Sequence, residues 1–254
     1  MKQMRLLMGM PITVEIVDPA ATQDDLERVF AYFTQIDETF STYKGTSEIS
    51  RLNRFMLRES ACSSDVRTIL KLADETNALT QGYFDIRRPD GTIDPSGIVK
   101  GWAIRNAARQ LDAKGWKNFY VEAGGDIEVR GRNTQGEAWQ IGIRDPFVQS
   151  NIVKVVHLQD AGIATSGTYI RGQHIRNPFA PGQPITDIVS LTVIGPNVYE
   201  ADRFATAAFA MGRAGITFIE RLAGCEGYMI DQSGVATMTS GFSAFTPRHA
   251  ALDR

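Results

Sequence analysis

The feature of this sequence that most constrains its fold is a run of short β-rich segments with no helix between them. From residue 117 to residue 167, five such segments are separated only by short turn-forming stretches: KNFYVEA, DIEVRGR, AWQIGIRD, NIVKVVHLQ and GIATSG. Parallel strands need crossover connections of a dozen or more residues, whereas sequential antiparallel strands need only turns. The run therefore predicts an antiparallel meander.

Helical patterns lie on both sides of this run. Residues 21–43, 63–80 and 97–115 precede it, and in the first of these Thr22 is an expected N-cap before apolar residues at helical spacing. A strand at 187–195, helices at 200–212 and 215–224, and a hairpin at 226–240 follow it. Another strand is expected near the start, where Ile12, Val14 and Ile16 alternate with other residues. The order predicts an α+β fold: one domain, residues 1–254, with antiparallel sheets flanked by helices.

The bulk properties exclude several classes of function. The net charge is −2 and 22% of the residues are charged, which gives no basic surface for nucleic acid or anionic membranes. No apolar run approaches the roughly 20 residues of a membrane span, and the first residues lack a signal-peptide core, so the chain as written is expected to be cytoplasmic. Two widely separated cysteines, Cys62 and Cys225, favour small buried residues over a disulfide framework.

The stretch EADRFATAAFAMG, residues 200–212, would suit a buried helix except for two polar side chains. Asp202 and Thr206 are four residues apart, so a helix places them on one face, one turn apart. Asp202 could instead cap the helix, and Thr206 could bond its own i−4 carbonyl. A carboxylate and a hydroxyl one turn apart could also bind a hard divalent cation, which prefers oxygen ligands.

Three further polar clusters lie in turns. In IDPSGIVKG, residues 93–101, Asp94 or Ser96 could cap a helix, or the helix start and Lys100 could attract an anion. Gly124-Gly125-Asp126 predicts a hairpin turn. His174, one of three histidines, lies in a long polar connection, where either a surface position or a catalytic role is compatible with the sequence.

Taken in order along the chain, eight segments resemble the ApbE family, the FAD:protein FMN transferases. The segments are LLMGMPITVEI, FSTYKGTSEISRLN, GYFDI, IDPSGIVKGWA, VEAGGDIEVRG, GIATSGTY, HIRNP and ADRFATAAFAMG. The resemblance implies an ApbE-like (T-fold-like) α+β fold. It also implies Mg2+ as cofactor, FAD as substrate and an acceptor flavoprotein as partner, with FMN passing to a threonine or serine hydroxyl and AMP released.

The resemblance also assigns roles to individual positions. It implies that Mg2+ is bound by the Asp202 and Thr206 side chains and the Gly97 carbonyl. It implies catalytic roles for Lys100 and His174, with His174 assisting proton removal. The positions expected to line the FAD site are Met8, Tyr43, Tyr83, Phe84, Asp85, Asp94, Lys100 and His174.

This sequence departs from the family pattern in places. Asp85 is followed by Asp94 after only IRRPDGTI, where the family has a longer stretch, so part of the wall around the flavin or adenine is expected to be missing. NPFAPGQP also stands where the family has Asp-Pro-Arg-Thr-Gly-x-Pro, and Met10 replaces the threonine that follows Met-Gly in the family. Two alternatives stay open: an Mg2+-dependent FAD pyrophosphatase, in which water replaces the protein hydroxyl, and a non-catalytic flavin-binding homologue.

Overall fold

The first half of the chain combines an N-terminal hairpin with four helices. A computed structural model describes residues 1–148, 150–168 and 175–247. The elements are β1 (Lys2–Leu7), β2 (Met10–Ile16), α1 (Gln23–Phe40), α2 (Glu48–Asn53), α3 (Ser64–Leu79) and α4 (Ser96–Ala113). The expected N-cap of α1 is confirmed, since Thr22 holds that position and its N–H donates to Asp25 Oδ2 at 2.9 Å. The sequence analysis missed β1 and α2.

The second half supplies most of the strands. They are β3 (Phe119–Ala123), β4 (Asp126–Arg130), β5 (Trp139–Arg144), β6 (Ile152–Leu158), β7 (Ala161–Gly167), β8 (Ile188–Gly195), β9 (Glu226–Asp231) and β10 (Ala236–Met238). Helices α5 (Val198–Ala210) and α6 (Gly215–Glu220) lie between β8 and β9. The described residues also form three short 3-10 helices, Glu59–Ala61, Gly212–Ala214 and Phe242–Phe245. The α+β prediction is confirmed.

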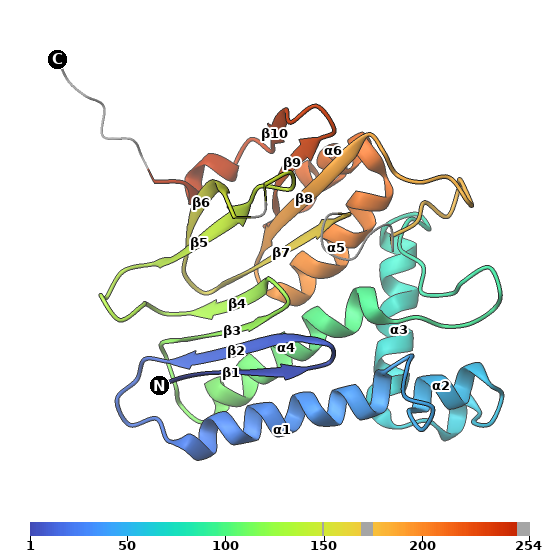
Figure 1. Cartoon of the computed structure of the whole chain (residues 1–254), viewed down its shortest axis with the longest axis horizontal. Helices are drawn as coiled ribbons and strands as arrows, with labels where there is room; N and C mark the ends of the chain where they lie inside the picture. Colours follow the sequence, from blue (N-terminus) through green and yellow to red (C-terminus); the bar gives the residue numbers. More distant parts are fainter. Residues whose placement is uncertain (149, 169–174, 248–254) are drawn as a thin grey trace.

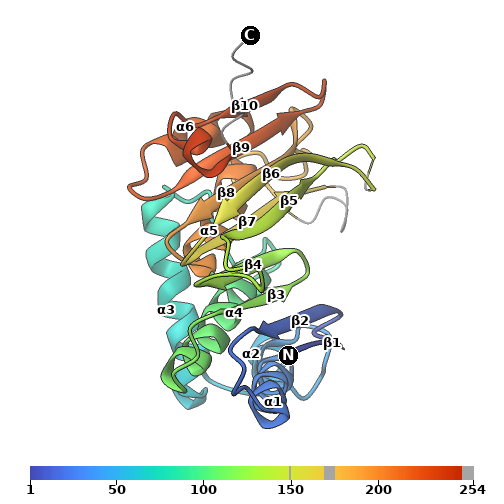
Figure 2. The same ribbon diagram turned by 90° about the vertical axis from the view of Figure 1, so that its left-hand side faces the viewer.

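Eight of the described strands form one antiparallel sheet in the order β1-β2-β3-β4-β7-β8-β9-β10. The predicted meander is interrupted, because β5 and β6 pair only with each other in the described chain. This hairpin covers the sheet, where Trp139, Ile143 and Val156 share a buried cluster with residues of β4, β7, β8 and β9. Figures 1 and 2 show the hairpin on one face of the sheet and α5 on the other.

The helices bury the opposite face of the sheet. Helices α1 and α4 share a buried cluster with β2 and β3 through Phe30, Phe33 and Ile104, and α3 packs against α4. Helices α5 and α6 pack on β7, β8 and β9 through Phe209 and Ile219. Both cysteines are buried, as expected, and neither is in a disulfide. None of the described helices is long and apolar enough to span a bilayer. Helices α4 and α5 meet beside the β3–β4 turn, and this junction holds the polar residues described next.

Candidate functional site

Helix α5 places Asp202 and Thr206 on one face, as predicted from their spacing. The N-cap of this helix is Asn197, whose Oδ1 accepts from the Glu200 N–H at 3.1 Å, so the capping role considered for Asp202 is wrong. Asp202 is only 4% exposed. No hydrogen bond joins the Thr206 hydroxyl to another described residue, so it does not bond its own i−4 carbonyl. The Asp202 carboxylate therefore does not cap the helix, and the Thr206 hydroxyl does not bond the helix backbone.

Helix α4 crosses this face of α5 at two glycines. A methyl group at Gly101 would lie 2.7 Å from Asp202 Cβ, and one at Gly97 would lie 3.2 Å from Thr206 Cγ2. The Gly101 N–H donates to Asp202 Oδ2 at 2.8 Å. In a regular α-helix that same N–H points at the Gly97 carbonyl. The structure thus brings Gly97, Asp202 and Thr206 together.

Lys100 lies between two buried carboxylates. Its Nζ is 2.6 Å from Asp126 Oδ2 and 3.7 Å from Asp202 Oδ1. Burial raises the pKa of the Asp202 carboxyl; Lys100 opposes this shift and Asp126 adds to it. Two acids facing one ammonium leave a net negative charge when all three are ionised. A buried excess charge of this kind favours a further cation.

Asp126 is the site residue that the sequence analysis missed. The predicted turn is confirmed: Gly124 and Gly125 have φ of 59° and 97°, the left-handed conformation that a two-residue hairpin turn requires. Asp126, directly after this turn, accepts from the Thr165 N–H on β7 at 3.2 Å and pairs with Lys100. The Gly124-Gly125-Asp126 segment predicted only a turn, because the partners that bring Asp126 into the site come from distant segments of the chain.

A second acid on β4 fixes the start of α5. Glu128, fully buried, accepts from the Val198 N–H through one carboxylate oxygen, and its other oxygen lies 2.8 Å from Arg130 Nη2. Burial raises the pKa of the Glu128 carboxyl, and Arg130 opposes the shift. On β7, a methyl group at Gly162 would lie 1.9 Å from the Val198 nitrogen, so only glycine permits this approach. The first turn of α5, and with it Asp202, is held against the sheet.

The residues expected to line the FAD site do not all lie at this cluster. Phe84 does: its ring edge would be 3.4 Å from a methyl group at Gly97. Tyr83 packs on Phe179, with ring centroids 4.8 Å apart. Met8 forms the β1–β2 turn with φ of 53°, and Tyr43 is 97% exposed after α1. No described contact joins Met8 or Tyr43 to the acidic cluster. His174 lies outside the described residues.

The short connection from Asp85 to Asp94 forms a small hairpin at the start of α4. Arg87 and Ile93 form a β-bridge, and the amide of Asn53 bonds both the N–H and the carbonyl of Ile93, at 2.7 and 2.8 Å. Asp85 Oδ1 accepts from the Arg87 N–H, and Arg176 donates to the Arg87 carbonyl. Segments far apart in sequence therefore hold this hairpin.

Asp94 performs the expected helix-start role in part. Its Oδ1 accepts from the Ser96 N–H at 3.1 Å, although the N-cap position itself is Pro95. Its other carboxylate oxygen accepts from Arg88 within the same hairpin. Burial raises the pKa of the Asp94 carboxyl, but the bonds from Arg88 and Ser96 outweigh this and leave the pKa below its usual value. Asp94 is therefore an ionised group just before the N-terminus of α4.

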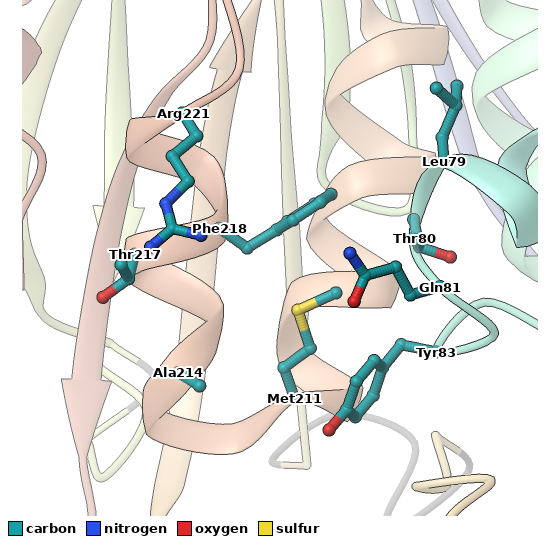
Figure 3. A pocket seen from close by; sticks show the side chains of 9 residues that line it. All are labelled: Leu79, Thr80, Gln81, Tyr83, Met211, Ala214, Thr217, Phe218 and Arg221. Atoms are coloured by element: carbon teal, nitrogen blue, oxygen red, sulfur yellow. The ribbon is translucent and has the colours of Figure 1, made fainter.

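A separate cavity of about 320 Å3 lies between the end of α3 and α6. Figure 3 shows Gln81 and Tyr83 on one side of it and Phe218 and Arg221 on the other. Tyr83 is the one expected flavin-site residue among those that line it, and none of its lining residues belongs to the Lys100–Asp126–Asp202 cluster. The 320 Å3 cavity and the buried charged groups thus lie in different places. Charged groups with a shifted pKa are the better guide to a reaction centre, so we take the Lys100–Asp126–Asp202 cluster as the candidate site.

The comparisons with known proteins give one consistent family match. The model of the ApbE family matches residues 8–88 and 86–229, in two parts that meet in the short hairpin. An FAD:protein FMN transferase of Vibrio cholerae is 29% identical over 255 aligned residues, covering 78% of this chain and 75% of the relative. One of Escherichia coli K12 is 31% identical over 186 residues, covering 70% of this chain and 53% of that relative.

Solved structures show the same likeness over nearly the whole chain. The flavin transferase ApbE from Vibrio cholerae superposes with a TM-score of 0.84 at 26% identity, covering 96% of this chain and 98% of that one. The ApbE protein of Thermotoga maritima gives a TM-score of 0.85 at 21% identity, which supports the fold alone.

Proposed function

The chain belongs to the ApbE family and is a transferase, and on that premise we propose that it moves FMN from FAD to a hydroxyl of an acceptor flavoprotein, with release of AMP. The observation that carries the proposal is the buried cluster of Lys100, Asp126 and Asp202 where α4, β4 and α5 meet. A diphosphate carries negative charge that such a site must neutralise, and the ammonium of Lys100 is placed to do so.

The residues at this cluster fit Mg2+. The hard oxygens available are the Asp202 carboxylate, the Thr206 hydroxyl and the Gly97 carbonyl. When Asp126 and Asp202 are both ionised, their charge exceeds that of Lys100 and favours a further cation. No group of three or more His, Cys, Asp or Glu side chains suited to a metal occurs in the described residues. The proposed site has one carboxylate and neutral oxygens, and substrate phosphates would complete the shell. When bound, Mg2+ would offset charge on the phosphoryl oxygens.

The chain's own residues would then divide the remaining work. Asp126 holds the Lys100 ammonium at 2.6 Å and so aims it toward Asp202, where the diphosphate would lie. The acceptor hydroxyl oxygen bonds the FMN-side phosphorus, the diphosphate P–O bond breaks, the hydroxyl proton leaves and AMP departs. We propose that His174 assists removal of that proton, because an unperturbed imidazole titrates near neutrality.

FAD contacts remain part of the proposal. Phe84 lies beside Gly97, and Asp85 and Asp94 flank the short hairpin that leads into α4, so these three positions border the cluster. Tyr83 borders the 320 Å3 cavity. Met8 and Tyr43 are proposed to contact FAD as well, and the exposed ring of Tyr43 is available to stack on a flavin.

One assay tests the function. The protein is incubated with FAD and Mg2+, with and without candidate flavoproteins, and covalent flavin, FMN and AMP are measured. Covalent flavin with AMP supports transfer. FMN and AMP without labelling would support the pyrophosphatase instead, and FAD binding without either product would support a non-catalytic homologue.

A matched pair of variants ties the activity to the cluster. Asp202→Asn keeps the size of the side chain but removes its charge, and should abolish Mg2+-dependent AMP release. Asp24→Asn, on the exposed side of α1, makes the same chemical change away from the cluster and should leave release unchanged. Equal AMP release from the wild type and Asp202→Asn would remove the metal assignment.

A further inference from the structure

The cavity of about 320 Å3 between the end of α3 and α6 is not used by the proposed reaction. Its lining comes from the end of α3 and the turn after it, the connection from α5 to α6, and α6 with the residue that follows it. The volume lies at the lower end of the roughly 300–1,000 Å3 of small-molecule sites. The cavity is therefore large enough for a small ligand of its own, and the chemistry of the lining decides which kind.

The charge of the lining favours an anion. Among the described residues that line the cavity, Arg221 alone is charged. Its guanidinium makes no ion pair or side-chain hydrogen bond with a described residue. The neighbouring acid, Glu220, is engaged elsewhere, because its carboxylate accepts from the Ser240 N–H at 2.9 Å and from the Ser240 hydroxyl at 2.6 Å. A guanidinium in this position can bind one carboxylate through two parallel hydrogen bonds.

The backbone of Gln81 is strained in a way that directs its side chain into the cavity. Its φ is 53°, in the left-handed region that glycine adopts freely and other residues rarely adopt. Figure 3 shows the Gln81 amide turned toward Met211 and Phe218 on the other side of the cavity. No described residue forms a hydrogen bond with this amide. Strained backbone of this kind gathers at ligand sites, and here it presents an unpaired polar group.

Aromatic side chains supply the apolar part of the lining, and they are held in place from outside the cavity. Phe218 packs edge-on against Phe204 of α5, with ring centroids 6.0 Å apart. Tyr83 packs edge-on against Phe179, with ring centroids 4.8 Å apart. Met211 lies between Phe218 and Tyr83 (Figure 3), and its thioether makes favourable contacts with aromatic rings. This lining suits a flat aromatic body.

We propose that this cavity is a second ligand site, which binds a small aromatic carboxylate. The ring lies between Phe218 and Tyr83 against Met211, the carboxylate pairs with Arg221, and the Gln81 amide bonds a polar group of the ligand. The site does not depend on the proposed function, because its lining shares no residue with the Lys100–Asp126–Asp202 cluster. FAD is the competing occupant, since Tyr83 is also a position expected to line the FAD site.

The test is isothermal titration calorimetry of the full-length protein with 2-naphthoate and with its neutral analogue 2-naphthamide. Naphthoate should bind at least about tenfold more tightly than the amide, because a hydrogen bond to a charged group contributes that factor or more. Arg221→Gln removes the cation and should reduce the affinity for naphthoate to that for the amide. Arg109→Gln makes the same change at an exposed position of α4 and should leave both affinities unchanged.

Two further variants test the shape of the site. Ala214→Trp places a ring in the cavity and should abolish naphthoate binding, whereas Ala31→Trp, on the exposed side of α1, should not. Gln81→Gly relieves the left-handed strain, so it should raise Tm, yet it should weaken naphthoate binding at least about threefold because the amide is lost. Equal binding of naphthoate and amide by the wild type, binding of neither at millimolar concentration, or unchanged naphthoate affinity in Ala214→Trp or Gln81→Gly would each overturn the assignment.

Titration in the presence of FAD and Mg2+ separates this site from the FAD site. The dissociation constant for naphthoate should stay within about twofold, because the cavity and the charged cluster share no lining residue. Loss of naphthoate binding when FAD is bound would assign the cavity to FAD and overturn the proposal. Failure of the proposed function is distinguishable: a protein that binds naphthoate but releases no AMP contradicts the function alone, and one that transfers flavin but binds no naphthoate contradicts the second site alone.

Discussion

Replacing Gly101 by alanine should separate the two helices that carry the proposed metal ligands. The added methyl group would lie 2.7 Å from Asp202 Cβ and 2.9 Å from the Val198 carbonyl oxygen. Carbon atoms in contact prefer about 3.5–4.0 Å, so α4 and α5 must part, or Asp202 must shift, by roughly 1 Å. Gly97→Ala should be milder, because its closest contact would be 3.2 Å, to Thr206 Cγ2.

The magnitude follows from two opposing effects. Overpacking of a tight contact costs about 1–3 kcal/mol, and alanine gains roughly 1 kcal/mol over glycine within a helix. Gly101→Ala should therefore lower the free energy of unfolding by about 1 kcal/mol, or Tm by about 2–4 °C for a chain of this size. A displacement of roughly 1 Å at a reacting site should lower AMP release on the order of 100-fold.

The assay is urea unfolding followed by circular dichroism, together with AMP release from FAD and Mg2+. Gln110→Ala, on the exposed side of the same helix, should change the unfolding free energy by less than about 0.5 kcal/mol and leave AMP release intact. If Gly101→Ala were as stable and as active as the wild type, the close crossing of α4 and α5 would not be what positions Asp202.

Three other predictions test separate parts of the account. Lys100→Met leaves Asp126 and Asp202 buried without their cation and should lower the free energy of unfolding by about 3–5 kcal/mol, measured by urea unfolding. Adding Asp126→Asn should recover part of this loss, and an unchanged stability of Lys100→Met would contradict the ion cluster. Thr206→Val should raise the Mg2+ concentration for half-maximal AMP release at least about tenfold, whereas Thr206→Ser should not, and equal behaviour of the two would remove the hydroxyl from the metal site. Burial raises the pKa of the Cys225 thiol to about 11, so the thiolate at pH 8 is on the order of 100-fold scarcer than in free cysteine. Alkylation of Cys225 should therefore be slow until urea unfolds the chain. Alkylation of the folded protein at the rate of free cysteine would contradict this.

Much of the fold could be predicted because its signals are local. The turn at Gly124 and Gly125 needs left-handed backbone, which two glycines supply, and the α5 pattern places Asp202 and Thr206 on one face whatever surrounds them. Strand β1 was missed because its side chains pair with β2 and are only half-buried, so no apolar alternation marks it. The turn that follows it starts with Met8 in a conformation unusual for a non-glycine residue.

The parts that could not be predicted depend on distant partners. The sequence of β5 and β6 suits a meander equally well, and only packing of Trp139 and Val156 on β4, β8 and β9 shows that the hairpin folds over the sheet. Asp126 is assigned to the site by Lys100, 26 positions before it, and by Thr165, 39 positions after it. Local spacing carries no information about such pairs.

The central claim is that Asp202, Thr206 and the Gly97 carbonyl bind a divalent cation that FAD shares. A crystal grown with FAD and Mn2+, with anomalous scattering used to locate the manganese, tests this most directly. The account predicts one manganese bonded to these three groups and to the FAD diphosphate, with Lys100 beside the phosphates. Manganese at another site, or FAD bound with its diphosphate away from α5, would contradict it.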